Sequence, residues 1–151
     1  MKLERLIQIY INYLRHQRNY SRETISHYRN TLHRFNSFLS DDESPLITEI
    51  RSIHLRRFLA HVGKNGVKPS TILHYIDELG AFFSYAVAEG YIEESPVKGI
   101  KKPKVPERVP EYLTVKELAR LFNAVDLKDK YGLRDLTILK TLYYAGLRAG
   151  E

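Results

Sequence analysis

"KPSTILHYIDELGAFFSYAVAEG", which runs from Lys68 to Gly90, is the stretch that predicts the fold class. Its apolar residues return every three or four positions, which is the period of an α-helix with one buried face. We expect Ser70 to cap the start of this helix and Gly90 to end it, because serine favours N-caps and glycine favours the C′ position. Its inner face consists of Ile72, Leu73, Ile76, Leu79, Phe83 and Val87.

The residues before this stretch predict three more helices. We expect Ser21 to cap the second of them and Ser52 to cap the third, with a loop at Asp41, Asp42 and Pro45 between the two. No alternating strand pattern is present, so the sequence predicts an all-α fold. The three apolar stripes are Leu3, Leu6, Ile7, Tyr10, Ile11 and Leu14; Ile25, Tyr28, Leu32, Phe35 and Leu39; and Leu55, Phe58, Leu59 and Val62.

A basic, proline-rich segment separates these four helices from the rest of the chain. Four of the six prolines lie between Ser95 and Pro110, and proline favours extended backbone over helix. We therefore predict one domain over residues 1–95, a semi-rigid linker over 96–112, and a second part over 113–151. The linker's cations favour a path along a phosphate backbone, and a solvated connector is the alternative.

The second part, residues 113–151, predicts two helices. Thr114 and Glu117 have the spacing of a capping box, and Gly146 ends the apolar pattern that follows. About 40 residues in two helices bury too little apolar surface for a core of their own. This part therefore reads as an incomplete domain.

Composition favours an anionic partner. The chain has a formal net charge of +6, and nucleic acid is the commonest partner of such a basic protein. It has no cysteine, and it has neither the long apolar run of a membrane span nor that of a signal peptide. These features agree with a cytoplasmic protein that does not enter a membrane.

Three groups of polar residues are candidate DNA contacts. The first group shares one side of the second helix, the second gathers where the fourth helix begins, and the third lies in the linker. Cations and hydroxyls near helix N-termini suit phosphate, although most charged helix faces are only solvated. The groups are Arg22, Ser26, Arg29 and His33; Lys68, Ser70, Thr71 and His74; and Lys101, Lys102 and Lys104.

The sequence offers no motif for a metal or a cofactor. The six histidines lack the ligand spacing of a zinc site, and no phosphate-cradling glycine loop is present. We therefore expect neither a metal nor a cofactor.

Four stretches of the chain resemble the tyrosine recombinases, the family of phage integrases and Xer-type enzymes. They cover nearly the whole length, and the last is the most specific of them. They are "YSRETISHYRNTLHRFNSFL" (Tyr20–Leu39), "KPSTILHYIDELGAFFSYAVAEGYIEESPVKGIKKPK" (Lys68–Lys104), "LTVKELARLF" (Leu113–Phe122) and "GLRDLTILKTLYYAGLRAGE" (Gly132–Glu151).

The resemblance implies a fold, a reaction and a site. The fold is a four-helix, SAM-like core-binding domain, a basic linker and two helices of a truncated catalytic domain. In the family a tyrosine attacks the scissile phosphate and forms a 3′-phosphotyrosyl link without metal or cofactor. Arg148 takes the position of the first catalytic arginine. A planar guanidinium can hold two phosphate oxygens and stabilise the transition-state charge.

The resemblance also limits what these 151 residues do by themselves. The family's other catalytic groups, including the nucleophilic tyrosine, lie downstream of the matched stretches. We therefore expect a piece of a longer recombinase that binds double-stranded DNA but does not cut it. The full-length enzyme would be a tetramer on DNA, and this piece a monomer in solution. A truncated, non-catalytic regulator of recombination and a helical protein-interaction module remain alternatives.

Overall fold

The computed structural model describes residues 1–40, 43–105, 111–148 and 150. Within them it contains six α-helices, one 3₁₀ turn and no strand, which confirms the all-α prediction. The chain divides into two compact units, Met1–Pro106 and Glu107–Glu151. The predicted loop residues Asp41 and Asp42 and the linker residues 106–110 lie outside the described residues.

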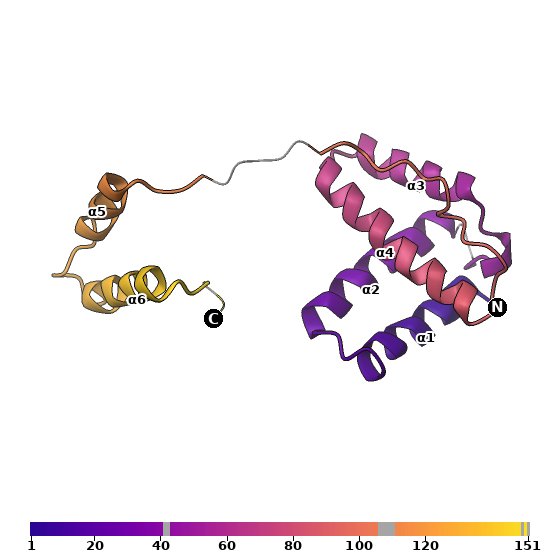
Figure 1. The fold of residues 1–151 in the computed structure, drawn as a ribbon, viewed down its shortest axis with the longest axis horizontal. Helices are drawn as coiled ribbons and strands as arrows, with labels where there is room; N and C mark the ends of the chain where they lie inside the picture. The colour runs from indigo at the N-terminus through magenta and orange to yellow at the C-terminus, as the bar shows by residue number, and fades with distance from the viewer. Residues whose placement is uncertain (41–42, 106–110, 149, 151) are drawn as a thin grey trace. The chain divides into compact units, whose positions relative to one another are not determined.

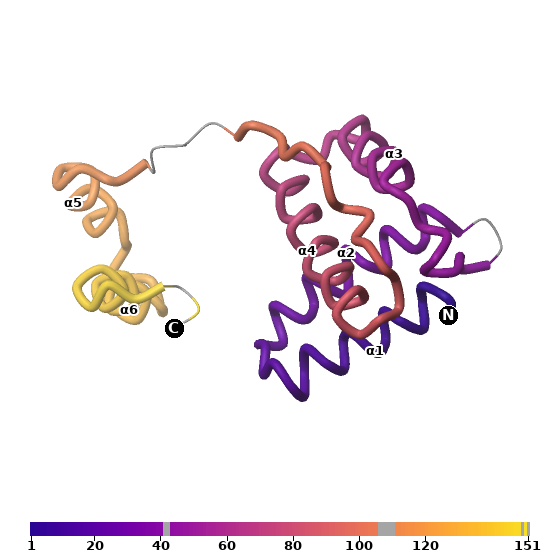
Figure 2. Tube along the Cα trace, turned by 45° about the vertical axis from the view of Figure 1, so that its right-hand side comes forward, coloured from indigo at the N-terminus to yellow at the C-terminus, as the bar shows by residue number. Residues whose placement is uncertain are grey.

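The first unit is built from four α-helices. Helices α1 and α2 form an antiparallel hairpin, and α4 crosses it with α3 beside it (Figures 1 and 2). The elements are α1 (Leu3–His16), α2 (Arg22–Leu39), η1 (Ile47–Glu49), α3 (Ser52–Lys64) and α4 (Pro69–Ala88).

The predicted N-cap of α2 is confirmed, while the predicted N-caps of α3 and α4 are wrong. Ser21 caps α2, since its hydroxyl accepts the Thr24 N–H at 3.1 Å. The prediction for Ser52 is wrong: Arg51 is the N-cap of α3, and its N–H donates to Nδ1 of His54 at 3.0 Å.

Ser70 is also not a cap, because α4 begins earlier than predicted. Lys68 is the N-cap and Pro69 is the first helical residue. Proline has the φ angle of a helix, and its missing N–H would be unpaired in the first turn in any case. Ser70 therefore lies inside the first turn. At the other end Glu89 is the C-cap and Gly90 follows at a φ of +73°, as predicted.

The core of the first unit contains most of the predicted stripe residues and some others, but Leu73 and Val87 of the predicted α4 face are only half-buried and do not pack into it. All six predicted residues of α1 are buried, as are Ile76, Leu79 and Phe83 of α4. Phe82 and Ala86 of α4 are fully buried as well, although they lie outside the predicted face. Helix α4 contacts both α2 and α3, and a helix with neighbours on several sides buries more than a single stripe.

The first part of the predicted linker packs against α4 and α3. Pro96 is buried, and Val97 and Ile100 contact the core. A Cβ added to Gly80 would lie 3.9 Å from the Val97 side chain, so this mid-helix glycine leaves room for the segment. Figure 2 shows the segment passing alongside α4 before the chain leaves the unit. Residues 96–100 therefore belong to the first unit rather than to a free linker.

The second unit consists of α5 (Val115–Asn123) and α6 (Gly132–Ala145). The capping box is confirmed: Thr114 N–H donates to Glu117 Oε2 at 2.8 Å, and Glu117 N–H donates to Thr114 Oγ1 at 3.3 Å. The hydrogen bond from the Thr114 backbone lowers the pKa of the Glu117 carboxyl. Gly132 is the one buried residue among those described here, and large apolar side chains such as Val115 remain exposed. These two helices enclose no core of their own.

Candidate nucleic-acid interface

A groove lies between α2 and the N-terminal half of α4. It encloses about 590 Å³. Most of its lining residues carry a polar group: hydroxyl, amide and imidazole groups lie beside one guanidinium and one carboxylate. Hydroxyl, amide and guanidinium groups suit phosphate oxygens and base edges. The lining residues are Thr24, His27, Asn30, Thr31, Arg34, Thr71, His74, Tyr75 and Glu78.

Arg34 and Tyr75 join the two walls of the groove. Arg34 Nη1 on α2 donates a hydrogen bond to the Tyr75 hydroxyl on α4 at 2.9 Å. Arg34 makes no ion pair with any residue that the structure describes, although the Glu78 carboxylate lines the same groove. The groove therefore contains a guanidinium that the Tyr75 hydroxyl holds between the two helices.

The predicted contacts on α2 lie on a different side of that helix. Arg22, Ser26 and Arg29 are exposed and His33 is half-buried, but none of the four lines the groove. Each residue turns an α-helix by about 100°, which places these four on the opposite flank of the apolar stripe from the groove residues. The two flanks look alike in the sequence, and only the position of α4 distinguishes them.

The predicted contacts on α4 divide between the groove and the outer surface. Thr71 and His74 line the groove, whereas Lys68 and Ser70 are exposed outside it. The structure thus brings Thr71 and His74 together with Arg34 and His27, which the sequence reasoning did not single out. The missed signal is a polar spacing of three and four residues at Thr24, His27, Thr31 and Arg34.

The linker lysines are exposed at the surface of the first unit. Lys102 Nζ lies 2.6 Å from Asp77 Oδ1 on α4, which anchors this segment to the helix. Both side chains are more than half exposed, so the pair contributes little to stability. Lys101 and Lys104 form no ion pair with another described residue. They can therefore meet an external anion with their charge intact.

Arg148 lies in the second unit, directly after the end of α6. Gly146 ends the helix at a φ of +64°, and the N–H of Leu147 donates to the Leu142 carbonyl at 3.0 Å. A glycine in the left-handed conformation together with this hydrogen bond is a common way to end an α-helix, and it fixes the direction in which the chain continues after α6. Arg148 is exposed there. Its predicted role on a scissile phosphate stays a prediction.

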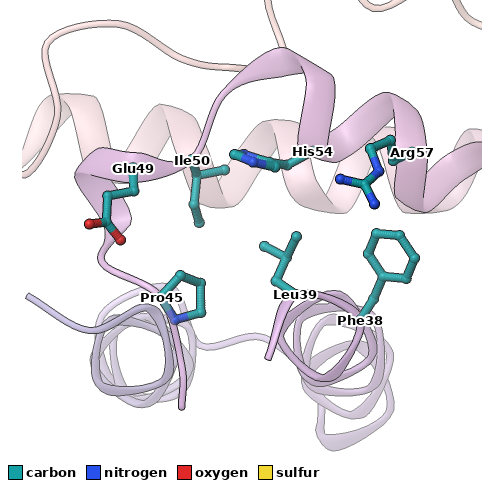
Figure 3. Close-up of a pocket in the computed structure, with 7 residues that line it drawn as sticks. All are labelled: Phe38, Leu39, Pro45, Glu49, Ile50, His54 and Arg57. Atoms are coloured by element: carbon teal, nitrogen blue, oxygen red, sulfur yellow. The ribbon is translucent and has the colours of Figure 1, made fainter. Parts of the chain in front are cut away.

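A second cavity, of about 340 Å³, lies between the end of α2, η1 and α3 (Figure 3). Two of its polar side chains, Glu49 and His54, are engaged in local backbone contacts. Glu49 Oε2 accepts the Leu46 N–H at 3.1 Å, and His54 Nδ1 accepts the Arg51 N–H. No predicted site residue lines it. The lining residues are Phe38, Leu39, Pro45, Glu49, Ile50, His54 and Arg57.

Two further properties of the described residues bear on the kind of site they can form. The described residues contain no group of three or more His, Cys, Asp or Glu placed to bind a metal ion. No helix in the same residues is long and apolar enough to cross a membrane. The α2–α4 groove is the candidate site that brings predicted contact residues together, and it offers hydrogen-bonding groups, one guanidinium and one carboxylate.

Comparison with known proteins identifies relatives over nearly the whole chain. The chain is 31% identical over 149 residues to tyrosine recombinase XerC of Bacillus subtilis (strain 168), covering 99% of this chain and 49% of that protein. It is 30% identical over 154 residues to a tyrosine recombinase of Thermosipho africanus (strain TCF52B), of which it covers 52%. The chain therefore spans about half the length of the curated relatives it matches.

Solved structures show the same fold. A lambda integrase (75–356) dimer bound to a COC′ core site matches with a TM-score of 0.68 and 22% identity, over 83% of this chain and 44% of that one. The integrase from mycobacterium phage Brujita matches with a TM-score of 0.61 and 20% identity, over 80% of this chain and 39% of that one. At this identity the likeness concerns the fold alone.

The family model for the phage integrase N-terminal SAM-like domain matches residues 7–90. This range begins in α1, includes α2 and α3, and ends just after α4, so it contains both walls of the groove. The resemblance that the sequence suggested is confirmed: the chain belongs to the phage integrase family of tyrosine recombinases.

Proposed function

We propose that this chain binds double-stranded DNA as the core-binding part of a site-specific tyrosine recombinase. The observation that supports it best is the groove between α2 and α4, where Arg34 donates a hydrogen bond to Tyr75 and forms no ion pair with a described carboxylate. The groove lies inside the range that matches the integrase N-terminal domain. Groups of this chemistry bind DNA phosphates and base edges in other proteins.

Each part of the surface has a role in the proposal. Helices α2 and α4 approach the major groove, which is wide enough to admit a helix. Thr71 lines the groove from the first turn of α4, where the positive end of the helix dipole favours an anion. Lys101 and Lys104 follow the phosphate backbone beside this contact.

The chemistry belongs to the whole recombinase in this proposal. A tyrosine would attack the scissile phosphate and form a 3′-phosphotyrosine intermediate, and a guanidinium at Arg148 would hold the phosphate oxygens. These 151 residues contain only the counterpart of the first catalytic arginine. We therefore expect them to bind DNA without cutting it.

A titration against duplex DNA at two salt concentrations tests the proposal. Binding led by phosphate contacts releases counterions, so the affinity should fall by about 10³ or more between 50 and 200 mM salt if six or more phosphates are contacted. Fluorescence anisotropy with a labelled duplex of random sequence measures this directly. Absence of binding at about 50 mM salt, or an affinity that salt does not change, would contradict the proposal.

A helical interaction module is the second candidate, and one observation favours it. Helices α5 and α6 expose apolar side chains, with Val115 at 83%, Leu133 at 71% and Tyr144 at 76% of their maximal accessible area. Exposed apolar surface of this kind typically contacts protein. The same titration separates the two candidates, because a pure interaction module has no reason to bind duplex DNA.

A further inference from the structure

The hydrogen bond between Arg34 and Tyr75 crosses the groove at the point where α4 passes over α2. The donor is Nη1 of an exposed arginine on α2, and the acceptor is the hydroxyl of a half-buried tyrosine on α4, at 2.9 Å. The two residues are 41 positions apart in the sequence. Their contact therefore depends on the tertiary fold and not on a local helical spacing.

The tyrosine side of this contact is held by the core. The ring of Tyr75 lies 6.0 Å from the ring of Phe58, which is fully buried. The Phe58 ring in turn packs edge-on against Phe35 at 5.2 Å. Two aromatic contacts thus link the Tyr75 ring to the centre of the unit, so its hydroxyl has a defined position at the groove.

The arginine side has no other anchor among the described residues. An exposed arginine loses much rotamer freedom when it binds a partner, and this loss weakens the contact. A hydrogen bond to a neutral hydroxyl restricts the side chain and leaves its charge intact. The guanidinium has five N–H donors, so four remain for a ligand.

We infer that Tyr75 is a positioning residue, which holds Arg34 in the groove so that its guanidinium binds a phosphate of the DNA backbone. The inference rests on the proposed function. It also assigns the main cationic contact of α2 to Arg34 rather than to Arg22 or Arg29 on the other flank. An acceptor with a full negative charge is favoured because a guanidinium forms its strongest hydrogen bonds with anionic oxygens.

Three single variants and one double variant test this inference. Tyr75→Phe removes the hydroxyl and keeps the ring, while Arg34→Gln removes the cation. Arg29→Gln is the matched control, because it makes the same change in charge on the same helix outside the groove. The double variant combines Tyr75→Phe with Arg34→Gln. Affinity for a random-sequence duplex is measured by anisotropy at several salt concentrations, and circular dichroism gives each melting temperature.

The expected pattern is specific to positioning. Tyr75→Phe weakens binding by about 3- to 10-fold, the range of one hydrogen bond, with its melting temperature unchanged. Arg34→Gln weakens binding by about 10-fold or more, and it reduces the slope of log affinity against log salt concentration by about 1, as expected for one lost phosphate contact. Arg29→Gln has a smaller effect on affinity than Arg34→Gln. The double variant binds no worse than Arg34→Gln alone, because the hydroxyl acts only through the guanidinium.

Several results would overturn the inference and leave the proposed function intact. The first is that Tyr75→Phe binds the duplex as tightly as the wild type. The second is that the affinity losses of Tyr75→Phe and Arg34→Gln add up in the double variant. The third is that Arg29→Gln loses as much affinity as Arg34→Gln. If a variant melts at a lower temperature, the affinities are compared well below the melting temperature of every variant. The comparison of the double variant with Arg34→Gln then still tests whether Tyr75 acts through Arg34. A wild-type chain that binds no duplex would refute the proposed function instead.

Discussion

Tyr10 brings together four other aromatic rings near the centre of the first unit. Its ring lies 5.3 Å from Phe82, 5.0 Å from Tyr85, 5.9 Å from Tyr28 and 6.0 Å from Tyr13. Burial is the main cause that raises the pKa of its hydroxyl above the usual value near 10, and the neighbouring tyrosines add to it. The folded state therefore favours the neutral phenol.

Replacing Tyr10 by phenylalanine should make the first unit less sensitive to alkali. The unfolded phenol loses its proton near pH 10, while the folded one still holds it, so the free energy of unfolding falls as the pH rises above about 10. Below that pH the contribution is fully present. Melting temperatures measured from pH 8 to pH 11 should fall less steeply for Tyr10→Phe than for the wild type. Parallel curves would contradict this account of Tyr10.

Tyr10→Phe also separates ionisation from packing. The variant keeps the ring and its aromatic contacts, so at pH 8 its stability should lie close to that of the wild type. A large loss of stability already at pH 8 would mean that the hydroxyl itself has a structural role. Tyr28, whose pKa burial also raises, remains in both proteins and affects them equally.

Helix α4 shows how many of the buried residues of one helix the sequence predicts and which of them it does not. Its apolar period correctly predicted Ile76, Leu79 and Phe83 in the core, because one face of a helix is always visible in the sequence. Phe82 and Ala86 were missed because α3, the α1–α2 hairpin and the Ser95–Ile100 segment surround this helix. Which neighbours surround a helix is a tertiary property.

Helix α2 shows the same limit for the site. Its polar residues follow both flanks of the apolar stripe, and the sequence reasoning chose the flank with Arg22 and Arg29. The groove lies on the other flank, with His27 and Arg34. Charge and spacing predicted DNA contacts on α2 and α4, which stays a prediction, while the crossing of α4 over α2 decides which flank of α2 lines the groove.

Gly80 offers a test of how the Ser95–Ile100 segment is held on α4. An added methyl would lie 3.9 Å from the Val97 side chain, an ordinary contact, and alanine has a higher helix propensity than glycine. Gly80→Ala should therefore be neutral or raise the free energy of unfolding by up to about 1 kcal/mol. Gly80→Leu should lower it by about 1–3 kcal/mol, because the larger side chain must displace the segment.

Urea unfolding, monitored by circular dichroism, measures the free energy of unfolding of both Gly80 variants and of the wild type. Alanine is the control for leucine, since both favour a helix and only the longer side chain reaches the segment. Equal stabilities of the two variants would mean that Val97 and Ile100 do not pack on α4 as described. A loss in Gly80→Ala would mean that the approach is closer than 3.9 Å.

Across the whole molecule the described units differ in how they are stabilised. The first unit contains every large apolar side chain that the described residues bury, while the second leaves residues such as Leu133 and Tyr144 exposed. The first unit should therefore fold on its own core, and the second should gain stability from further partners. This difference agrees with a chain that spans about half the length of its relatives XerC and the Thermosipho recombinase.

The proposed function requires that the α2–α4 groove of the first unit binds duplex DNA. Amide chemical shifts of the ¹⁵N-labelled chain, recorded while a random-sequence duplex is added at low salt, test it most directly. We expect the largest changes in chemical shift at the groove residues Thr24, His27, Arg34, Thr71 and His74. Changes centred on the second cavity around Ile50 and His54, or no changes at all, would contradict it.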